Sequence, residues 1–125
     1  MRDSAGDVFL ADCPARLAVE IITSKWAVVV LFALSRRPYR HGELVDLIGG
    51  VSRKVLTQTL RKLQAYGLVE RRAHAEASSR VEYSLTGLGL TLAEPIAALT
   101  DWARSYGEAV VGFQEAAEND PTSGA

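Results

Sequence analysis

Residues 49–67 have the sequence GGVSRKVLTQTLRKLQAYG, in which a glycine-containing turn precedes a helix-forming stretch and another glycine follows it. Ser52 is placed to accept a hydrogen bond from a free backbone N–H at the helix start, and Gly67 to end the helix in the left-handed conformation. Leucines recur at spacings of four and three, which puts them on one face. The stretch predicts an amphipathic helix from Ser52 to Tyr66 that buries Leu56, Leu60 and Leu63 and exposes Arg53, Lys54, Thr57, Gln58, Arg61 and Lys62.

Three further helices are predicted before this one. The first begins at Pro14, because proline suits the first helical turn. The second is capped by Ser24 and ends at Arg37, because the residue before a proline avoids the helical region. A short extended piece at 38–40 leads to the third, from His41 to Ile48. Their apolar faces consist of Leu17, Ala18, Ile21 and Ile22; of Trp26, Val29, Val30, Ala33 and Leu34; and of Leu44, Leu47 and Ile48.

A β hairpin and a long last helix are predicted after Gly67. Alternating strand-forming residues favour strands at 68–74 and 80–85, joined by a small polar tip at 75–79. Thr86 caps the last helix, and Pro95 bends it. The apolar positions of this helix follow a spacing close to that of a coiled-coil seam: Leu88, Leu92, Ile96, Leu99, Trp102, Tyr106, Val110 and Phe113.

The order of these elements predicts a mainly α-helical chain with a small β hairpin. A helix–turn–helix pair followed by a two-stranded wing is typical of a DNA-binding winged helix, and its turn here is Gly49-Gly50-Val51. We expect an N-terminal arm at 1–12 and one winged helix-turn-helix domain at 13–114. The last helix of that domain covers about 86–114, and a disordered tail follows at 115–125.

Charge is segregated along the 125 residues, although the net charge is only −1. Residues 36–80 carry ten basic and four acidic side chains, whereas residues 81–125 carry one basic and seven acidic ones. The middle block therefore has a charge of +6 and coincides with the predicted winged helix, and the last block has a charge of −6. A basic block on such a motif indicates a nucleic-acid partner.

Several classes of protein lack support in the sequence. No apolar run approaches the roughly 18 residues that a membrane helix needs, and the polar, acidic N-terminus does not resemble a signal peptide. We therefore expect a cytoplasmic protein without a membrane partner. The single cysteine and two unclustered histidines indicate no metal site. Nucleophile-elbow, phosphate-loop and dinucleotide motifs are missing, so we expect neither an enzyme nor a cofactor.

The predicted partner is double-stranded DNA. The start of the helix at Ser52 offers free N–H groups, a positive dipole end and the cations Arg53 and Lys54 to phosphates. Further residues can reach base edges or backbone: Thr57, Gln58 and Arg61 from the helix, and Arg72 or Arg80 from the wing. The alternatives are an ordinary solvated helix face and a winged helix that docks an acidic protein partner.

At these residues the sequence resembles the HxlR-type winged helix-turn-helix transcriptional regulators, relatives of the MarR group. The resemblance covers about residues 13–107 and differs at His41-Gly42, where the family commonly has Phe or Thr followed by Ser or Asn. It implies a sequence-specific regulator. The matching pieces are Cys13-Pro14, Lys25-Trp26, 40–44, 51–60, 66–71, 80–86 and Asp101-Trp102.

The resemblance also implies a homodimer. The last helix supports this, because it carries more apolar surface than one small winged helix can cover. The alternative is packing within one chain, against the first two helices. A two-fold dimer would bind an inverted repeat. The expected interface residues are Leu92, Ile96, Leu99, Trp102 and Tyr106.

Cys13 is the candidate redox sensor. It precedes Pro14 at a predicted helix start, with Arg16 one turn away, and both features favour a reactive thiolate. The resemblance implies a thiol switch for electrophiles, quinones or oxidants. With no second cysteine, oxidation would give a bridge to Cys13 of a second subunit, a mixed disulfide or an adduct. Two alternatives stay open: an inert cysteine, and a MarR-like response to a non-covalent aromatic effector.

Overall fold

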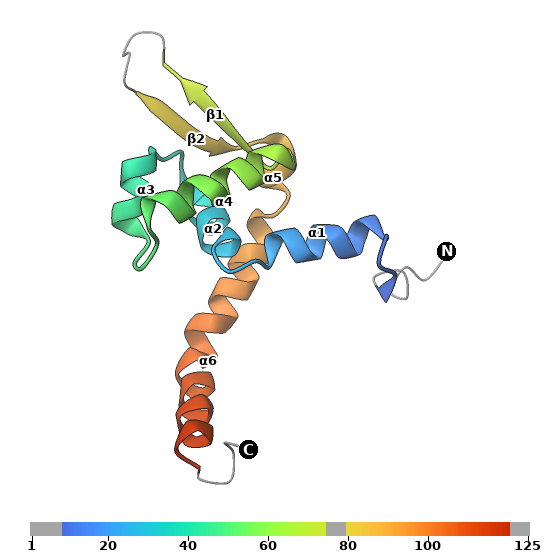
Figure 1. Cartoon of the computed structure of the whole chain (residues 1–125), viewed down its shortest axis with the longest axis vertical. Helices are drawn as coiled ribbons and strands as arrows, with labels where there is room; N and C mark the ends of the chain where they lie inside the picture. The colour runs from blue at the N-terminus through green and yellow to red at the C-terminus, as the bar shows by residue number, and fades with distance from the viewer. Residues whose placement is uncertain (1–8, 75–79, 121–125) are drawn as a thin grey trace. The chain divides into compact units, whose positions relative to one another are not determined.

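The computed structural model describes residues 9–74 and 80–120, which fall into two compact units that divide at residues 93 and 94. The first unit contains α1 (Pro14–Ile22), α2 (Ala27–Arg36), α3 (His41–Leu47), α4 (Arg53–Ala65), β1 (Val69–Ala73), β2 (Val81–Leu85) and α5 (Gly87–Leu90). The second unit consists of α6 (Ala93–Asn119), which begins at the division (Figure 1). The predicted mainly α-helical class with one two-stranded hairpin is confirmed.

α4 begins and ends where its local sequence predicts. The Ser52 hydroxyl accepts a hydrogen bond from the backbone N–H of Val55 at 3.1 Å. At the other end Gly67 has a φ of +76°, and the N–H groups of Gly67 and Leu68 donate to the carbonyls of Gln64 and Leu63. This pair of bonds forms a Schellman motif, which only a residue tolerant of positive φ closes without strain.

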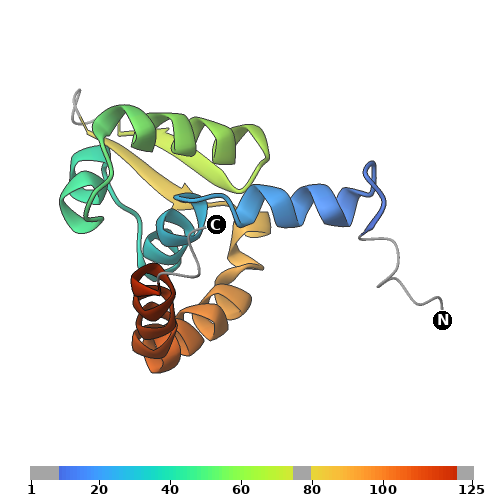
Figure 2. The same ribbon diagram turned by 60° about the horizontal axis from the view of Figure 1, so that its bottom comes forward.

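The hairpin is antiparallel, with Val69 opposite Leu85 and Ala73 opposite Val81. The predicted extended piece before α3 adds a single bridge, in which Tyr39 and Tyr83 exchange backbone hydrogen bonds of 3.0 and 2.8 Å. α4 packs on β1 and α3 packs on α4, so the hairpin and the helix pair form one body (Figure 2).

The core of the first unit lies between α2, α3, α4 and the base of the hairpin. Its fully buried side chains include the three leucines predicted for α4. Burying their apolar surface stabilises the fold by about 25 cal/mol per Å². No polar or charged residue of the described part is buried, so the polar side chains lie on surfaces. The buried leucines and valines of this core are Val30, Leu31, Leu34, Leu44, Val51, Leu56, Leu60, Leu63, Leu68, Val69 and Leu85.

Two predictions about α2 were wrong. Ser24 does not cap it: the Ser24 hydroxyl donates to the carbonyl of Ile21, and Trp26 precedes the first helical residue. Val29 is 41% exposed rather than buried, and Trp26 is only partly buried.

The predicted last helix is interrupted. Thr86 caps the short helix α5, as its hydroxyl accepts from Gly89, but residues 91 and 92 separate α5 from α6. Pro95 does not bend α6, because it lies in the first turn, where its missing N–H breaks no helical bond. α6 continues to Asn119, so residues 115–119 of the expected tail are helical. Residues 1–8, the hairpin tip at 75–79 and the end of the tail at 121–125 lie outside the described residues.

Candidate nucleic-acid interface

The N-terminal turn of α4 combines free backbone donors with two cations. Arg53 and Lys54 are exposed, and neither forms an ion pair in the part of the chain that the structure describes. Ser52 satisfies one of the four orphan N–H groups of the helix start. The positive end of the helix dipole and both side-chain charges therefore act in the same direction, toward an anion.

Three predicted base-reading residues lie further along α4. Gln58 and Arg61 are exposed, and their spacing places them on the face opposite the buried leucines. Thr57 is half-buried on the flank next to α3. Its Oγ1 donates to the Arg53 carbonyl at 2.9 Å and lies 2.9 Å from Nε2 of His41.

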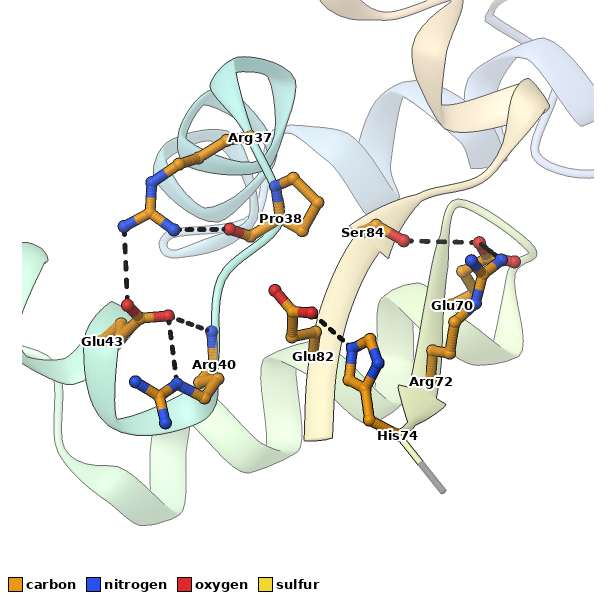
Figure 3. A network of polar contacts seen from close by, with 9 residues as sticks. All are labelled: Arg37, Pro38, Arg40, Glu43, Glu70, Arg72, His74, Glu82 and Ser84. Carbon is orange, nitrogen blue, oxygen red and sulfur yellow. Dashed lines mark hydrogen bonds and ion pairs between the residues drawn. The ribbon is translucent and has the colours of Figure 1, made fainter. Parts of the chain in front are cut away.

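The polar face of the hairpin carries paired charges (Figure 3). Arg72 forms a 3.0 Å ion pair with Glu70, whose carboxylate also accepts from Ser84. His74 contacts Glu82 across the strands at 2.5 Å. Arg72, which the sequence predicts as a DNA contact, is thus 68% exposed but already partnered.

Arg80, the other predicted wing contact, is exposed at the start of β2 and lines a small cavity of about 220 Å³ with Arg37, Arg40, Glu43 and Glu82. The cavity holds three arginines and two carboxylates. Of the predicted wing contacts, Arg80 is the one with no ion pair among the described side chains.

Arg71 is a residue that the sequence reasoning missed. It follows Glu70 on β1 and therefore projects from the other face of the hairpin. There it lines an open cavity of about 520 Å³ together with Arg40, His41, Asp46 and Tyr83. The alternation of side chains along a strand is the sequence signal that separates Arg71 from Arg72.

Glu43 organises the start of α3. Its carboxylate accepts a 2.8 Å hydrogen bond from the backbone N–H of Arg40 and lies 3.6 Å from the guanidinium groups of Arg37 and Arg40 (Figure 3). The backbone hydrogen bond, followed by the two arginine charges, holds the pKa of Glu43 below its usual value.

Comparison with known proteins places this arrangement in a family. The model of the HxlR-like helix-turn-helix family matches residues 21–111, well over half of the chain. The chain belongs to the HxlR-like helix-turn-helix family. Its members among similar proteins are transcriptional regulators, and its solved neighbours have the same winged helix fold, as the sequence predicts.

Three similar proteins illustrate this HxlR-like relationship. YtfH, an HTH-type transcriptional regulator of Escherichia coli (strain K12), is 42% identical over 97 residues, which are 78% of this chain and 77% of YtfH. The structure of the regulator ytfH from Salmonella typhimurium has a TM-score of 0.73 at 36% identity and covers 86% of this chain and 96% of its own. The structure of the redox regulator HypR in its reduced form has a TM-score of 0.71 at 26% identity and covers 79% of this chain and 98% of its own.

Cys13 of this HxlR-like chain is the N-cap residue of α1 and is 9% exposed. Arg16, expected to act on the thiol, has its guanidinium engaged elsewhere: it binds Glu20 and the carbonyl of Phe9, both at 3.0 Å. Pro14, the residue after Cys13, lines an apolar groove of about 480 Å³ together with Leu17, Ile21, Tyr66, Leu88 and Leu92.

The predicted interface residues differ in exposure. Leu92 lines the apolar groove of the first unit, and Ile96 is buried within the single chain. Leu99, Trp102 and Tyr106 are each about half exposed on α6, and the two aromatic rings contact each other in a tilted arrangement with centroids 5.7 Å apart. The accessible apolar surface of α6 thus begins at Leu99.

No single helix in the described ranges is long and apolar enough to cross a membrane; α1 and α2 reach the required length and hydropathy only together, and they are bent by 81°. Residues 9–74 and 80–120 contain no cluster of three side chains suited to a metal ion.

Proposed function

We propose that this HxlR-like protein is a homodimeric, sequence-specific regulator that binds an inverted-repeat DNA operator through α4 and the hairpin. The observation that carries the proposal is the exposed face of α4. There Arg53, Lys54 and Arg61 stand beside Gln58 without any acidic partner among the described residues.

The surrounding charges support the same interpretation of the face. Glu43 and Glu70 are each engaged by at least one neighbouring arginine. Their negative charge is therefore largely compensated, while the cations of α4 are not. An uncompensated basic helix on a winged helix fold favours a polyanion with grooves over an acidic protein.

Dimerisation is supported by the apolar surface of α6. Leu99, Trp102, Tyr106 and Val110 are each about half exposed, and Phe113 is 80% exposed. The steps of three and four residues between them form a continuous stripe along the helix. Such a stripe favours burial against the same stripe of a second copy, which gives a two-fold dimer and two equivalent half-sites.

The direct test is selection of DNA by the purified protein from a pool of randomised duplexes and from duplexes upstream of its own gene. We expect enrichment of an inverted repeat, whose binding weakens steeply as salt rises. Recovery of unenriched sequences, or binding that is indifferent to salt, would contradict the proposal.

A second proposal is that oxidation of Cys13 controls DNA binding. It is favoured by the likeness to HypR, a redox regulator, and by the position of the thiol at the start of α1. A thiol that is 9% exposed leaves little room for an added group, so any adduct must displace the start of α1.

The diamide response of the wild type and of Cys13→Ser separates the possible signals. Diamide would take two electrons and two protons from two Cys13 thiols and leave a disulfide between subunits. We expect a change in operator affinity in the wild type that Cys13→Ser abolishes. Persistence of the response in Cys13→Ser would exclude the thiol switch. A rise in the melting temperature of both proteins with aromatic compounds would instead favour a non-covalent effector.

A further inference from the structure

His41 and Thr57 join the two helices of the helix–turn–helix pair. His41 is the first residue of α3, and Thr57 lies in the second turn of α4. Nε2 of His41 and Oγ1 of Thr57 are 2.9 Å apart, and both residues are half-buried. The same Oγ1 lies 2.9 Å from the backbone carbonyl of Arg53.

The two contacts determine where the protons lie. A hydroxyl group has one hydrogen, and the carbonyl of Arg53 can only accept. The Thr57 hydrogen is therefore donated to Arg53, and Oγ1 must accept from a protonated Nε2 of His41. Threonine otherwise divides between two rotamers in a helix, so the additional bond to His41 selects one of them. The hydroxyl oxygen keeps one free lone pair and has no hydrogen left to donate.

We propose that His41 is a specificity-determining positioning residue that makes Thr57 an acceptor-only reader of the operator. This inference rests on the proposed DNA-binding function. In the major groove adenine N6 and cytosine N4 offer hydrogens, whereas the O6 and N7 atoms of guanine only accept. Thr57, held by His41, therefore accepts from adenine or cytosine at its position of each half-site and discriminates against guanine.

Five proteins test the assignment: the wild type, His41→Phe, His41→Gln, Thr57→Val and the double variant that combines His41→Phe with Thr57→Val. Phenylalanine removes the donor, glutamine keeps an N–H that can replace it, and valine removes the hydroxyl with little change of shape. Each protein is titrated with the selected operator and with single-base variants at the position that Thr57 faces, with fluorescence anisotropy as the readout.

We expect the wild type to bind the adenine or cytosine operator roughly tenfold more tightly than the guanine variant, the lower end of the discrimination of a good base contact. His41→Phe should lose most of that ratio and His41→Gln should retain it. Thr57→Val should lose it as well, and adding His41→Phe to Thr57→Val should then change nothing further.

The inference is overturned if His41→Phe or Thr57→Val leaves the base ratio unchanged. It is also overturned if His41→Gln and His41→Phe lose the ratio equally, because bulk rather than a donor would then matter. Should His41→Phe fail to fold, Thr57→Val and His41→Gln still decide the question. Failure of the wild type to bind any duplex would instead overturn the DNA-binding proposal itself, together with this inference.

Discussion

Arg71 and Arg72 are adjacent in sequence but occupy different electrostatic environments. Arg72 shares the polar face of the hairpin with Glu70 and pairs with it, whereas Arg71 faces the cavity beside α3 and has no ion pair among the described residues. The same distinction separates Glu43, which is engaged by two arginines, from Arg53 and Lys54, which have no ion pair in the described part of the chain. At the scale of single residues, the proposed DNA binding therefore depends on which charges remain uncompensated.

Replacing Arg53 by alanine should weaken operator binding and flatten the dependence of log affinity on log salt concentration by about one unit, because one phosphate contact is lost. Fluorescence anisotropy at several salt concentrations measures both quantities. Arg104→Ala is the matched control, since this exposed arginine lies on α6 and pairs with Asp101. An equal slope in Arg53→Ala and the wild type would remove Arg53 from the interface.

Arg71→Ala should cost more DNA affinity than Arg72→Ala, although both remove one positive charge from neighbouring positions. Arg72 already pairs with Glu70, so it has less free charge to offer to DNA, although its loss also releases the Glu70 carboxylate. The ratio of the two affinities for the same duplex is the measurement. Equal losses would show that the faces of the hairpin do not differ in their exposure to DNA.

Glu43 gives the fold a dependence on acid. Its pKa is lower in the folded chain than its ordinary value of 4.5, so the folded state binds the proton more weakly. The stabilisation that the ionised Glu43 carboxylate gives to the folded state is complete at pH values above about 4.5, and it is lost as the pH falls through the pKa of the folded state. Urea unfolding from pH 6 to pH 3 should show a smaller loss of stability in Glu43→Gln than in the wild type or in Glu108→Gln. A parallel decline in all three would contradict this role.

The elements differ in how far local sequence determines them. α4 is predicted to within a residue because its ends depend on Ser52 and Gly67, which act on backbone atoms a few positions away. The break between α5 and α6 cannot be predicted from local sequence, because the apolar periodicity continues through it. There the hydroxyl and N–H of Thr91 both bind the Leu88 carbonyl and tighten the turn. The His41–Thr57 contact was equally inaccessible, because it needs two helices to approach across 16 positions.

Gly89 shows how tightly α5 is held against the hairpin. A Cβ atom added there would lie 2.1 Å from the carbonyl oxygen of Leu68, which is backbone and cannot rotate away. We expect Gly89→Ala to destabilise the fold by about 2–3 kcal/mol through overpacking. Gly87→Ala is the control, since its Cβ would meet nothing within 4 Å. Similar urea midpoints for the two variants would mean that α5 can shift at little cost.

The whole molecule divides its charge and its apolar surface between two units. The basic block spans α3, α4 and β1 of the first unit, whereas six of the seven acidic residues of the last block belong to the second unit. The net charge of −1 conceals both. The exposed aromatic and aliphatic stripe belongs to α6, so the unit proposed to join two chains is not the one proposed to bind DNA.

Replacing Trp102 and Tyr106 together by serine should convert a dimer into a monomer, because these two rings, which contact each other, are the largest side chains of the exposed stripe. Sedimentation equilibrium gives the mass directly. Affinity for the complete operator should fall at least tenfold, while affinity for an isolated half-site changes little. A dimer that survives the double substitution would move the interface away from this part of α6.

Hydroxyl-radical footprinting of the selected operator tests the central claim, that a two-fold dimer presents two copies of α4 to DNA. The account predicts two equivalent protected segments related by an inverted repeat, with centres about one helical turn or a multiple of it apart. Both segments should disappear in a variant that lacks the Arg53 and Lys54 side chains. A single protected segment, or protection that survives their removal, would contradict the account.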